Sequence, residues 1–520
     1  MDWRDVWEEN QGSWFDLVAC CYYVICAGGN ERPGFSARVE SAVSMPGSPV
    51  DEFVRSVRGI VPANGLGRRC TKEQIAELYC LCNRYKSDPA WPSEYTDEIG
   101  CWAIIAGIDK CVADSGSAKL VGKMGPLNKV LCERVGVYYK HSPAPIDDIL
   151  SSYGICSSPM ETLSERLQGL SVVARIPPHR LPVIWKPSGA VVRIGDNAHG
   201  RQSDGSTTPS LKLRLGIIAC SHNISIGSNS PDISIVQDGA AGLFGVEYAP
   251  AYGERYEELI GAPLDRAIAE GCNCVVFPEM VFSPEYLERL KSQLKTANDA
   301  GVLRLVVAGT AWCPSGRPDE GSNTCYVLDR YGNELSATSK KHPYINDHVE
   351  PHQIEGLDPS IDETTLLDIE GLGRLMIAIC KDMESDTDYS YMMASAFRPD
   401  MLCVPAASGS VKGAFLDRAK LISKRLHAIC CISNLCSMVQ FRSNEDDISF
   451  VTAPEVLVSE FRGRQPDAKV AFCARSALCG TSKGKCVSEG CLFVVDIDYD
   501  KQIGGRIPLM AVGDLSYIRR

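Results

Sequence analysis

The sequence predicts an α/β fold in its C-terminal part and a mainly helical domain in front of it. In the later part, short apolar segments alternate with amphipathic segments of helical periodicity, an order typical of α/β layers. In the earlier part, the clearest signals are helix starts followed by apolar residues at helical spacing. Between them lies a stretch rich in Gly, Ser, Thr and Pro. We therefore expect a helical domain over 1–190, a linker over 191–210, an α/β domain over 211–500 and a C-terminal tail over 501–520.

Composition narrows the class of protein. The 520 residues are 45% hydrophobic and 23% charged, as in folded soluble proteins. Lys and Arg total 53 against 65 Asp and Glu, and no long basic tract occurs, which disfavours nucleic acid and anionic membranes as partners. The apolar run over 17–27 is shorter than the roughly 20 residues of a membrane-spanning helix. Acidic residues precede this run where a signal peptide carries basic ones, so we expect a cytoplasmic protein.

The 24 cysteines are scattered along the chain. Many lie in apolar runs that resemble buried strands: ACCYYVIC, LYCLC, CNCVVF and ICCISNLC. This distribution is typical of small buried thiols in a reducing compartment rather than of a disulfide scaffold. No CxxC pair occurs, so paired zinc knuckles are excluded.

Two segments in the N-terminal part carry helix-start signals. Thr71 stands three residues before Gln74, which predicts a capping box at the start of TKEQIAELYCLCNRYK. Ser158 and Pro159 predict the N-cap and first turn of a second helix, SPMETLSERLQGL. No convergent set of catalytic residues occurs over 1–185.

The C-terminal part predicts seven buried strands and two helices. The helices are PAYGERYEELIGAPLDRAIAEG, closed by Gly271, and SPEYLERLKSQLKTANDAG, started by Ser283 and closed by Gly301. The strands are LRLGIIAC, CNCVVFPE, RLVVAGTA, NTCYVLD, LMIAIC, MLCVPAAS and AICCISN.

Reactive side chains stand at three of these strand ends: Glu279 in VVFPE, Lys340 and Lys341 in TSKKHP, and Cys380 in IAICKD. Each residue alone has an ordinary structural explanation as a cap, a surface charge or a core thiol. Ends of buried strands are, however, where α/β proteins assemble their sites.

In this order and context, the three elements resemble the carbon-nitrogen hydrolase family, the nitrilase superfamily. The resemblance covers about 211–500 and includes the opening strand LRLGIIAC, the hairpin NTCYVLDRYGNEL, the strand in FRPDMLCVPAAS and the element ISN that ends at Asn434. It implies an α-β-β-α sandwich with Glu279, Lys340 and Cys380 as the catalytic triad. It also implies no metal or organic cofactor, and assembly into homo-oligomers.

The chemistry explains why these residue types are needed. A thiol attacks an amide or nitrile carbon as the thiolate, so Cys380 needs a base, and Glu279 can take its proton and return it to the leaving group. Lys340 and the backbone N–H of Lys381 can stabilise the developing oxyanion. Water activated by Glu279 then cleaves the thioester.

Two assignments have a rival nearby. Lys340 fits the family pattern before His and Pro, with Lys341 as the alternative. Members also use a second Glu after the Lys, for which Glu355 is our candidate and Glu350 the rival.

Lys381 occupies the place where the family commonly has an aromatic residue, and Asp382 the place of the following acid. The shorter acid is more typical of members that hydrolyse amide and carbamoyl compounds than of nitrilases. Lys381 and Asn434 are candidate substrate-binding residues, although Lys381 could instead pair with Asp382 or Glu384 at the surface.

Three histidines, His342, His348 and His352, lie close together with Asp347 and Glu350 among them. Their irregular spacing on an expected loop disfavours a metal site, and His342 is expected to orient the loop by hydrogen bonding.

The predicted function is hydrolysis of a linear amide or carbamoyl compound through a thioester, with a small-molecule amide or nitrile as substrate. The alternatives are a nitrilase proper, an N-acyltransferase, or an interaction or sensing protein related to stress or defence. Members of the N-acyltransferase kind usually carry many membrane-spanning helices, which we do not find. The N-terminal domain is expected to gate the site, fix an oligomer or bind a protein partner.

Overall fold

The fold is taken from a computed structural model of the chain, which divides into two compact units. The N-terminal unit comprises Met1–Pro143, Pro159–Arg180 and Ala396–Arg398, and the C-terminal unit comprises the remainder. The structure describes residues 2–9, 12–27, 46–61, 69–114, 135–139, 167, 170–174, 183–191, 199–201, 207–209, 212–220, 224–226, 232–237, 242–297, 302–315, 320–346, 352–358, 364–370, 372–384, 390–391, 393–394, 399–426, 428–438, 447–459, 463–474, 481–482, 485–486, 490–498, 506–507 and 509–512.

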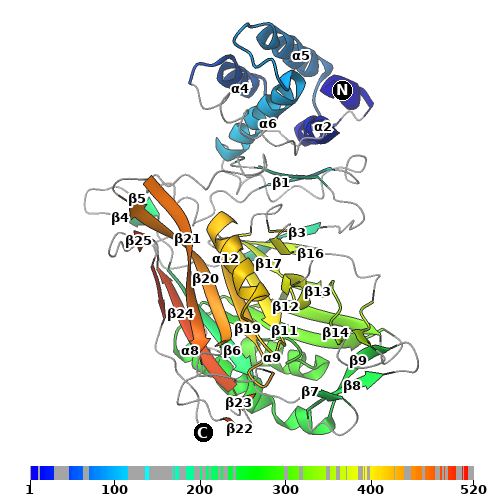
Figure 1. The fold of residues 1–520 in the computed structure, drawn as a ribbon, viewed down its shortest axis with the longest axis vertical. Helices are drawn as coiled ribbons and strands as arrows, with labels where there is room; N and C mark the ends of the chain where they lie inside the picture. The colour runs from blue at the N-terminus through cyan, green and yellow to red at the C-terminus, as the bar shows by residue number, and fades with distance from the viewer. Residues whose placement is uncertain are drawn as a thin grey trace. The chain divides into compact units, whose positions relative to one another are not determined.

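The N-terminal unit is built mainly from helices over its described residues (Figure 1). The capping box predicted at Thr71 is confirmed: its hydroxyl accepts from the backbone N–H of Gln74, whose side chain accepts from the N–H of Thr71. Most of the helix predicted from Ser158 lies outside the described residues, but its end is wrong: Leu167 is not helical, and Leu170 begins a strand that pairs with 135–139. The helices are α1 (Trp3–Glu9), α2 (Trp14–Ala27), α4 (Pro49–Ile60), α5 (Lys72–Lys86) and α6 (Thr96–Asp114), and β1 (Val135–Tyr139) pairs antiparallel with β2 (Leu170–Ala174).

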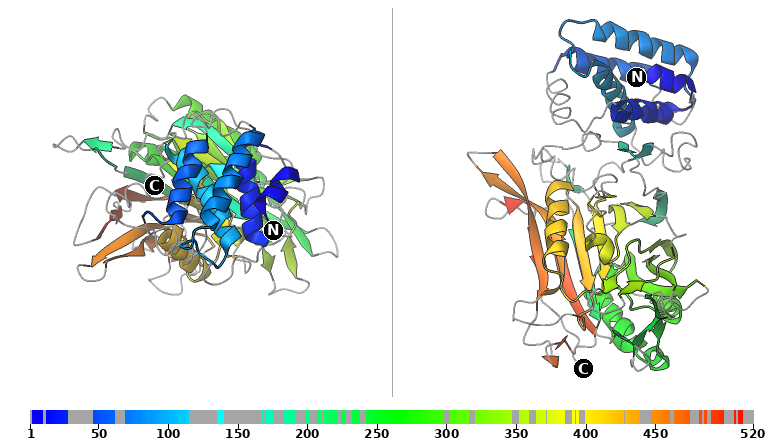
Figure 2. Two further views of the ribbon diagram at one scale, coloured as in Figure 1. Left: turned by 90° about the horizontal axis from the view of Figure 1, so that it is seen from above. Right: turned by 45° about the vertical axis from the view of Figure 1, so that its right-hand side comes forward.

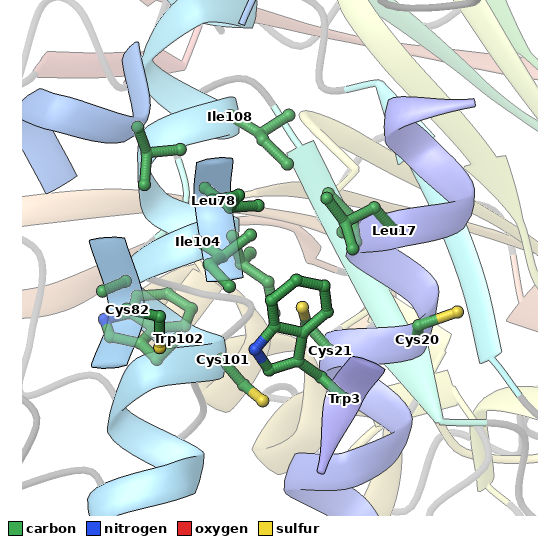
Figure 3. Close-up of a cluster of buried hydrophobic side chains, with 14 of the residues drawn as sticks. Trp3, Leu17, Cys20, Cys21, Leu78, Cys82, Cys101, Trp102, Ile104 and Ile108 are labelled. Carbon is green, nitrogen blue, oxygen red and sulfur yellow. The ribbon is translucent and has the colours of Figure 1, made fainter. Parts of the chain in front are cut away.

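An apolar core holds these helices together. Figure 3 shows Trp3 of α1, Leu17 of α2, Leu78 of α5 and Ile104 of α6 gathered in it, and all four side chains are buried. The cysteine-rich run ACCYYVIC, which resembles a buried strand, lies in α2, whereas LYCLC lies in α5, the helix predicted from the capping box at Thr71. A short apolar run does not distinguish a buried strand from a buried helix, and here the packing decides.

Two large sheets form the C-terminal unit (Figure 1). Within the described residues, the first has the order β13 (Glu334–Ser339), β12 (Gly321–Asp329), β11 (Leu305–Pro314), β10 (Cys274–Val276), β6 (Lys212–Cys220), β24 (Gly490–Asp498), β26 (Leu509–Val512). The second has the order β21 (Gly463–Ala474), β20 (Asp447–Ser459), β19 (Ile429–Asn434), β18 (Met401–Ala406), β17 (Gly373–Ile377), β16 (Thr364–Glu370), β3 (Val183–Val191), with β25 (Arg506–Ile507) beside β20. All seven predicted strands are confirmed.

The two large sheets face each other and carry helices on their outer sides. Ser433 of β19 donates a hydrogen bond to the carbonyl oxygen of Ile218 in β6 at 3.0 Å, which joins the sheets directly. The 3-10 helix η5 (Pro250–Glu254), the π-helix η6 (Glu257–Gly261), α8 (Ala262–Ala269) and α9 (Pro284–Thr296) pack on the first sheet. Helix α12 (Ala414–Leu426) packs on the second (Figure 2).

The predicted helix boundaries hold in part. The side chain of Ser283 caps α9, as predicted, and Gly271 closes the preceding helical segment with φ +73°. That segment is not one helix but the succession of η5, η6 and α8. Helix α9 ends at Thr296, and Gly301 lies outside the described residues.

Strand pairing extends beyond the predicted limits of the α/β part. β3 pairs in parallel with β16, so 183–191 joins the C-terminal unit. A short hairpin of β4 (His199–Arg201) and β5 (Thr207–Pro209) lies within the expected linker, and β25 and β26 within the expected tail. Gly- and Pro-rich composition indicates turns but carries no signal for long-range pairing.

The C-terminal unit also contains a smaller sheet. Its order is β14 (Ile345–Asn346), β15 (Gln353–Glu355), β9 (Leu243–Tyr248), β8 (Ile233–Gln237), β7 (Ile224–Ile226), and a further hairpin pairs β22 (Thr481–Ser482) with β23 (Lys485–Cys486). α10 (Lys381–Glu384) follows β17. Across the described part of the chain, no helix is long and apolar enough to cross a membrane.

Replacing Leu78 by Ala should lower the free energy of unfolding of the N-terminal unit by about 2–5 kcal/mol, because it leaves a cavity in the helical core. Denaturant unfolding monitored by circular dichroism measures the change. Glu77→Ala, at the neighbouring exposed position of the same helix, serves as the control and should change the value by less than about 0.5 kcal/mol. Equal effects of the two substitutions would contradict this account of the core.

Candidate active site

The three predicted catalytic residues follow three different strands and are almost fully buried. Glu279 follows β10, Lys340 follows β13 and Cys380 follows β17, with exposures of 1%, 4% and 8%. Backbone hydrogen bonds connect two of them to the end of β18: Glu279 N–H donates to Ala406 O at 3.3 Å, and Cys380 N–H donates to Pro405 O at 2.9 Å. Adjacent carbonyl groups of one strand therefore set the positions of the carboxylate and the thiol.

Lys340 bridges two buried carboxylates. Its Nζ donates to Glu279 Oε1 at 2.9 Å and to Glu355 Oε2 at 2.7 Å. Of the neighbouring residues Lys340 and Lys341, Lys340 is therefore the one that contacts Glu279 and Glu355, and these three residues form a buried charged cluster. Glu355, at the end of β15, also accepts from the backbone N–H of Tyr344 at 2.9 Å. Its rival Glu350 lies outside the described residues.

Asn323 belongs to the same cluster, although the sequence analysis did not single it out. Its Nδ2 donates to Glu279 Oε1 at 2.8 Å and to Glu355 Oε1 at 2.9 Å. Because carboxylates only accept hydrogen bonds, this orientation of the amide is the one that fits. Asn323 lies in the hairpin NTCYVLDRYGNEL, and the signal that could have indicated it is a polar amide inside a buried strand.

The cysteine sits on a strained turn between a strand and a helix. Cys380 has φ +44°, and Met280, which follows Glu279, has φ +59°. Left-handed conformations of non-glycine residues are costly and cluster at functional sites. Met383 N–H donates to Cys380 O at 2.9 Å, which closes the turn that follows the thiol.

The electrostatics of the cluster set the protonation states. Burial, together with the charge of Glu279, raises the pKa of the Cys380 thiol well above its usual value, although Lys340 opposes this. Burial also raises the pKa of Glu279, against the lowering effect of Lys340. Burial alone would lower the pKa of Lys340, but the surrounding carboxylates raise it well above its usual value. The resting site therefore holds a neutral thiol and a charged ammonium.

The thiol has two hydrogen-bonding neighbours, the carboxyl of Glu279 and the backbone N–H of Ala407. Lys340 and Asn323 both donate to Oε1 of the same carboxyl group. A carboxylate beside the thiol can accept the thiol proton directly.

The two predicted substrate-binding residues have other contacts. Lys381 is 35% exposed and lies 3.5 Å from Glu384, in agreement with the surface-pair alternative. Asn434 is fully buried; its Oδ1 accepts from Ser408 N–H at 2.8 Å, and its Nδ2 donates to Ser408 O at 3.0 Å. Asn434 therefore holds the loop after β18, and its predicted contact with a substrate stays a prediction. Sequence order alone does not show which way such a side chain points.

A close backbone approach positions the Glu279 turn. Gly309 has φ +51° at an irregularity in β11, and a Cβ atom there would overlap the carbonyl oxygen of Pro278. The next residue, Thr310, accepts from the N–H of Met280 at 2.8 Å through its hydroxyl. Only glycine allows β11 to lie this close to the turn.

Over the described residues, no group of three or more His, Cys, Asp or Glu side chains is arranged to hold a metal ion. His348 and Asp347 of the predicted histidine-rich loop lie outside these residues. His342 hydrogen-bonds with Asp382 at 3.0 Å, which agrees with the loop-orienting role expected for it.

Comparisons with known proteins give weak similarities only. No family model matches the chain, and no curated protein matches it. Solved structures that match include an amidase from Nesterenkonia sp., with 16% identity over 50% of this chain and 90% of that chain at a TM-score of 0.32. Another is NitN amidase from the same source, with 16% identity over 50% of this chain and 92% of that chain at a TM-score of 0.33. A third is a mutant of that amidase in which acrylamide has added to the active site cysteine, with 17% identity over 50% and 92% at a TM-score of 0.32.

Replacing Gly309 by Ala should lower the free energy of unfolding by about 1–3 kcal/mol, because the added methyl group forces β11 away from Pro278. Denaturant unfolding tests this. Gly253→Ala is the matched control, since a Cβ atom there meets no other atom within 4 Å, and it should change stability by less than about 0.5 kcal/mol. A Gly309→Ala protein as stable as the control would refute the proposed close approach.

Replacing Lys340 by Met should lower the free energy of unfolding by about 3–5 kcal/mol near neutral pH, because two buried carboxylates lose their counter-ion. The pKa of Glu279 is already raised above the ordinary 4.5, and loss of the ammonium raises it further. The folded variant then binds a proton that the unfolded chain releases, so stability falls as the pH rises above 4.5.

Unfolding at pH 5 and pH 8 measures this difference. The stability deficit of Lys340→Met should be smaller at pH 5. Lys420→Met, on the exposed face of α12, removes one positive charge elsewhere and should show little deficit at either pH. A pH-independent deficit for Lys340→Met would contradict the carboxylate assignment.

Proposed function

We propose that the C-terminal unit is a carbon-nitrogen hydrolase of the nitrilase superfamily type, which cleaves a linear amide or carbamoyl compound through a thioester on Cys380. One observation carries the proposal: the thiol stands on a strained turn beside the buried carboxyl of Glu279, whose Oε1 accepts hydrogen bonds from Lys340 and Asn323. A thiol beside a base, with a cation paired to that base, is the set of groups that acyl transfer to sulfur requires.

In the first half-reaction, Glu279 takes the proton of the Cys380 thiol as sulfur attacks the carbonyl carbon of the substrate. The carbonyl oxygen gains the negative charge, which the ammonium of Lys340 and the N–H of Lys381 stabilise. When the tetrahedral intermediate collapses, the C–N bond breaks and Glu279 returns the proton to the departing nitrogen. Ammonia or an amine leaves, and the acyl group stays on sulfur.

In the second half-reaction, water replaces the amine. Glu279, ionised again, takes a proton from water while the oxygen attacks the thioester carbon. The same two donors stabilise the second tetrahedral intermediate, and its collapse breaks the C–S bond. Glu279 returns the proton to sulfur, so the carboxylic acid product leaves and the thiol is restored.

The roles within the cluster follow from its electrostatics. Lys340 has a pKa well above its usual value, so it serves as a fixed positive charge rather than as a base. The pKa of Glu279 is raised by burial, which brings it closer to the range of an efficient acid and base near neutral pH. Glu355 accepts hydrogen bonds from both Lys340 and Asn323, which fixes the ammonium beside Glu279.

An amide is favoured over a nitrile by the sequence that follows the nucleophile. Lys381 replaces the aromatic residue of the family pattern, and Asp382 is the shorter acid that its amide-hydrolysing members carry. A protein that only binds a ligand would have no need for this buried set of charges, since such sets are expensive to desolvate. A nitrilase or an N-acyltransferase would use the same thioester and differ in substrate or acceptor.

Purified protein should release ammonia from at least one member of a panel of linear amides and carbamoyl compounds, and Cys380→Ala should abolish this release. Intact mass should show a transient acyl adduct on wild type. Cys80→Ala, which removes an exposed thiol of the N-terminal unit, is the matched control and should keep both activity and adduct.

The alternatives give different outcomes in the same assay. Turnover confined to nitriles would favour a nitrilase, and faster loss of the adduct with added amines than with water would favour a transferase. No turnover on any substrate, with Cys380 unreactive toward iodoacetamide, would overturn the enzymatic proposal.

A further inference from the structure

A buried carboxylate at the start of α10 collects four hydrogen bonds from two separate segments of the chain. Oδ1 of Asp382 accepts from the backbone N–H groups of Lys341 at 3.0 Å and His342 at 2.8 Å. The ring Nδ1 of His342 lies 3.0 Å from the same oxygen. Oδ2 accepts from the backbone N–H of Ile379 at 3.1 Å. Asp382 is only 2% exposed.

These partners are the chain neighbours of two residues of the proposed catalytic set. Lys341 directly follows Lys340, and Ile379 directly precedes Cys380. One carboxylate thus binds the backbone beside the ammonium and the backbone beside the thiol. Because the turn at Cys380 has a positive φ, surrounding contacts are needed to keep it in place.

We propose that Asp382 is a positioning residue that sets the distance between the Lys340 ammonium and the Cys380 thiol. This inference rests on the proposed function. The backbone groups that contact the Asp382 side chain are all N–H donors. An ionised carboxylate only accepts hydrogen bonds, so one oxygen can bind the segment 341–342 and the other can bind Ile379. The His342 ring must then donate from Nδ1. Asn at this position would place its NH₂ group, which is a donor, against the N–H donors of one of the two segments, so one set of hydrogen bonds would be lost.

The substitution Asp382→Asn should lower kcat for ammonia release by about 100-fold with little change in KM, as expected when reacting groups are displaced by about an ångström. A second measurement needs no turnover: the pH dependence of alkylation of Cys380 by iodoacetamide. Lys340 lowers the pKa of this thiol, so displacing the ammonium should shift the alkylation profile to higher pH. Loss of a negative charge alone would shift it to lower pH.

Glu384→Gln is the matched control, because it removes a partly exposed acid from the same short helix. It should leave kcat and the alkylation profile unchanged. If Asp382→Asn does not fold, Asp382→Glu keeps the charge and the acceptors but moves them by one methylene group. Positioning predicts a folded Asp382→Glu protein with reduced kcat and a profile shifted to higher pH.

The outcomes separate this inference from the proposed function. A wild type without turnover, whose alkylation profile still moves to higher pH in the Asp382 variants, would overturn the hydrolase and keep the positioning role. Turnover in wild type with unchanged kcat and profile in either folded Asp382 variant would overturn the positioning role. A profile shifted to lower pH would also overturn it, since that is the effect of charge alone.

Discussion

The bridge from Lys340 to the carboxylates of Glu279 and Glu355 is the interaction on which the C-terminal unit's candidate site depends. Two buried carboxylates repel each other and lose their hydration, so they are tolerated only with a cation and further donors in close contact. The amide of Asn323 supplies such a donor to each carboxylate. These hydrogen bonds and ion pairs offset the cost of burying the charges only while all four side chains stay in contact. The strands that carry them must therefore keep their relative positions.

Those positions come from the way the two large sheets meet. Glu279 follows a strand of one sheet and Cys380 a strand of the other, yet both donate their backbone N–H to neighbouring carbonyls at the end of β18. The sheets are also joined by Ser433, and β11 approaches the Glu279 turn at Gly309. The turns that carry a base from one layer and a nucleophile from the other are thereby fixed to the same strand, which suits a site that needs accurate geometry.

The N-terminal unit is stabilised by different means. Its described helices bury apolar and thiol side chains in a common core, and α6 is buried on nearly all sides, as expected of a central helix. The pKa of buried thiols such as Cys20 and Cys82 is raised to about 12, mainly by burial. These thiols therefore act as small apolar core residues, and the unit's role in gating, assembly or partner binding stays a prediction.

The sequence by itself determined the local elements and the order of the chemistry. Buried strands, the caps at Thr71 and Ser283, and the succession of Glu279, Lys340 and Cys380 at strand ends are all legible in residue patterns, because caps, periodicity and strand ends depend on near neighbours. Only the tertiary structure decided which side chains meet. Contacts between segments far apart in the chain bring Lys340 rather than Lys341 into the cluster and add Asn323 to it. Such contacts also bury the carboxylate of Asp382 and bind Asn434 to the loop after β18. Side-chain direction at such meeting points is set by strand pairing and packing, which no local pattern contains.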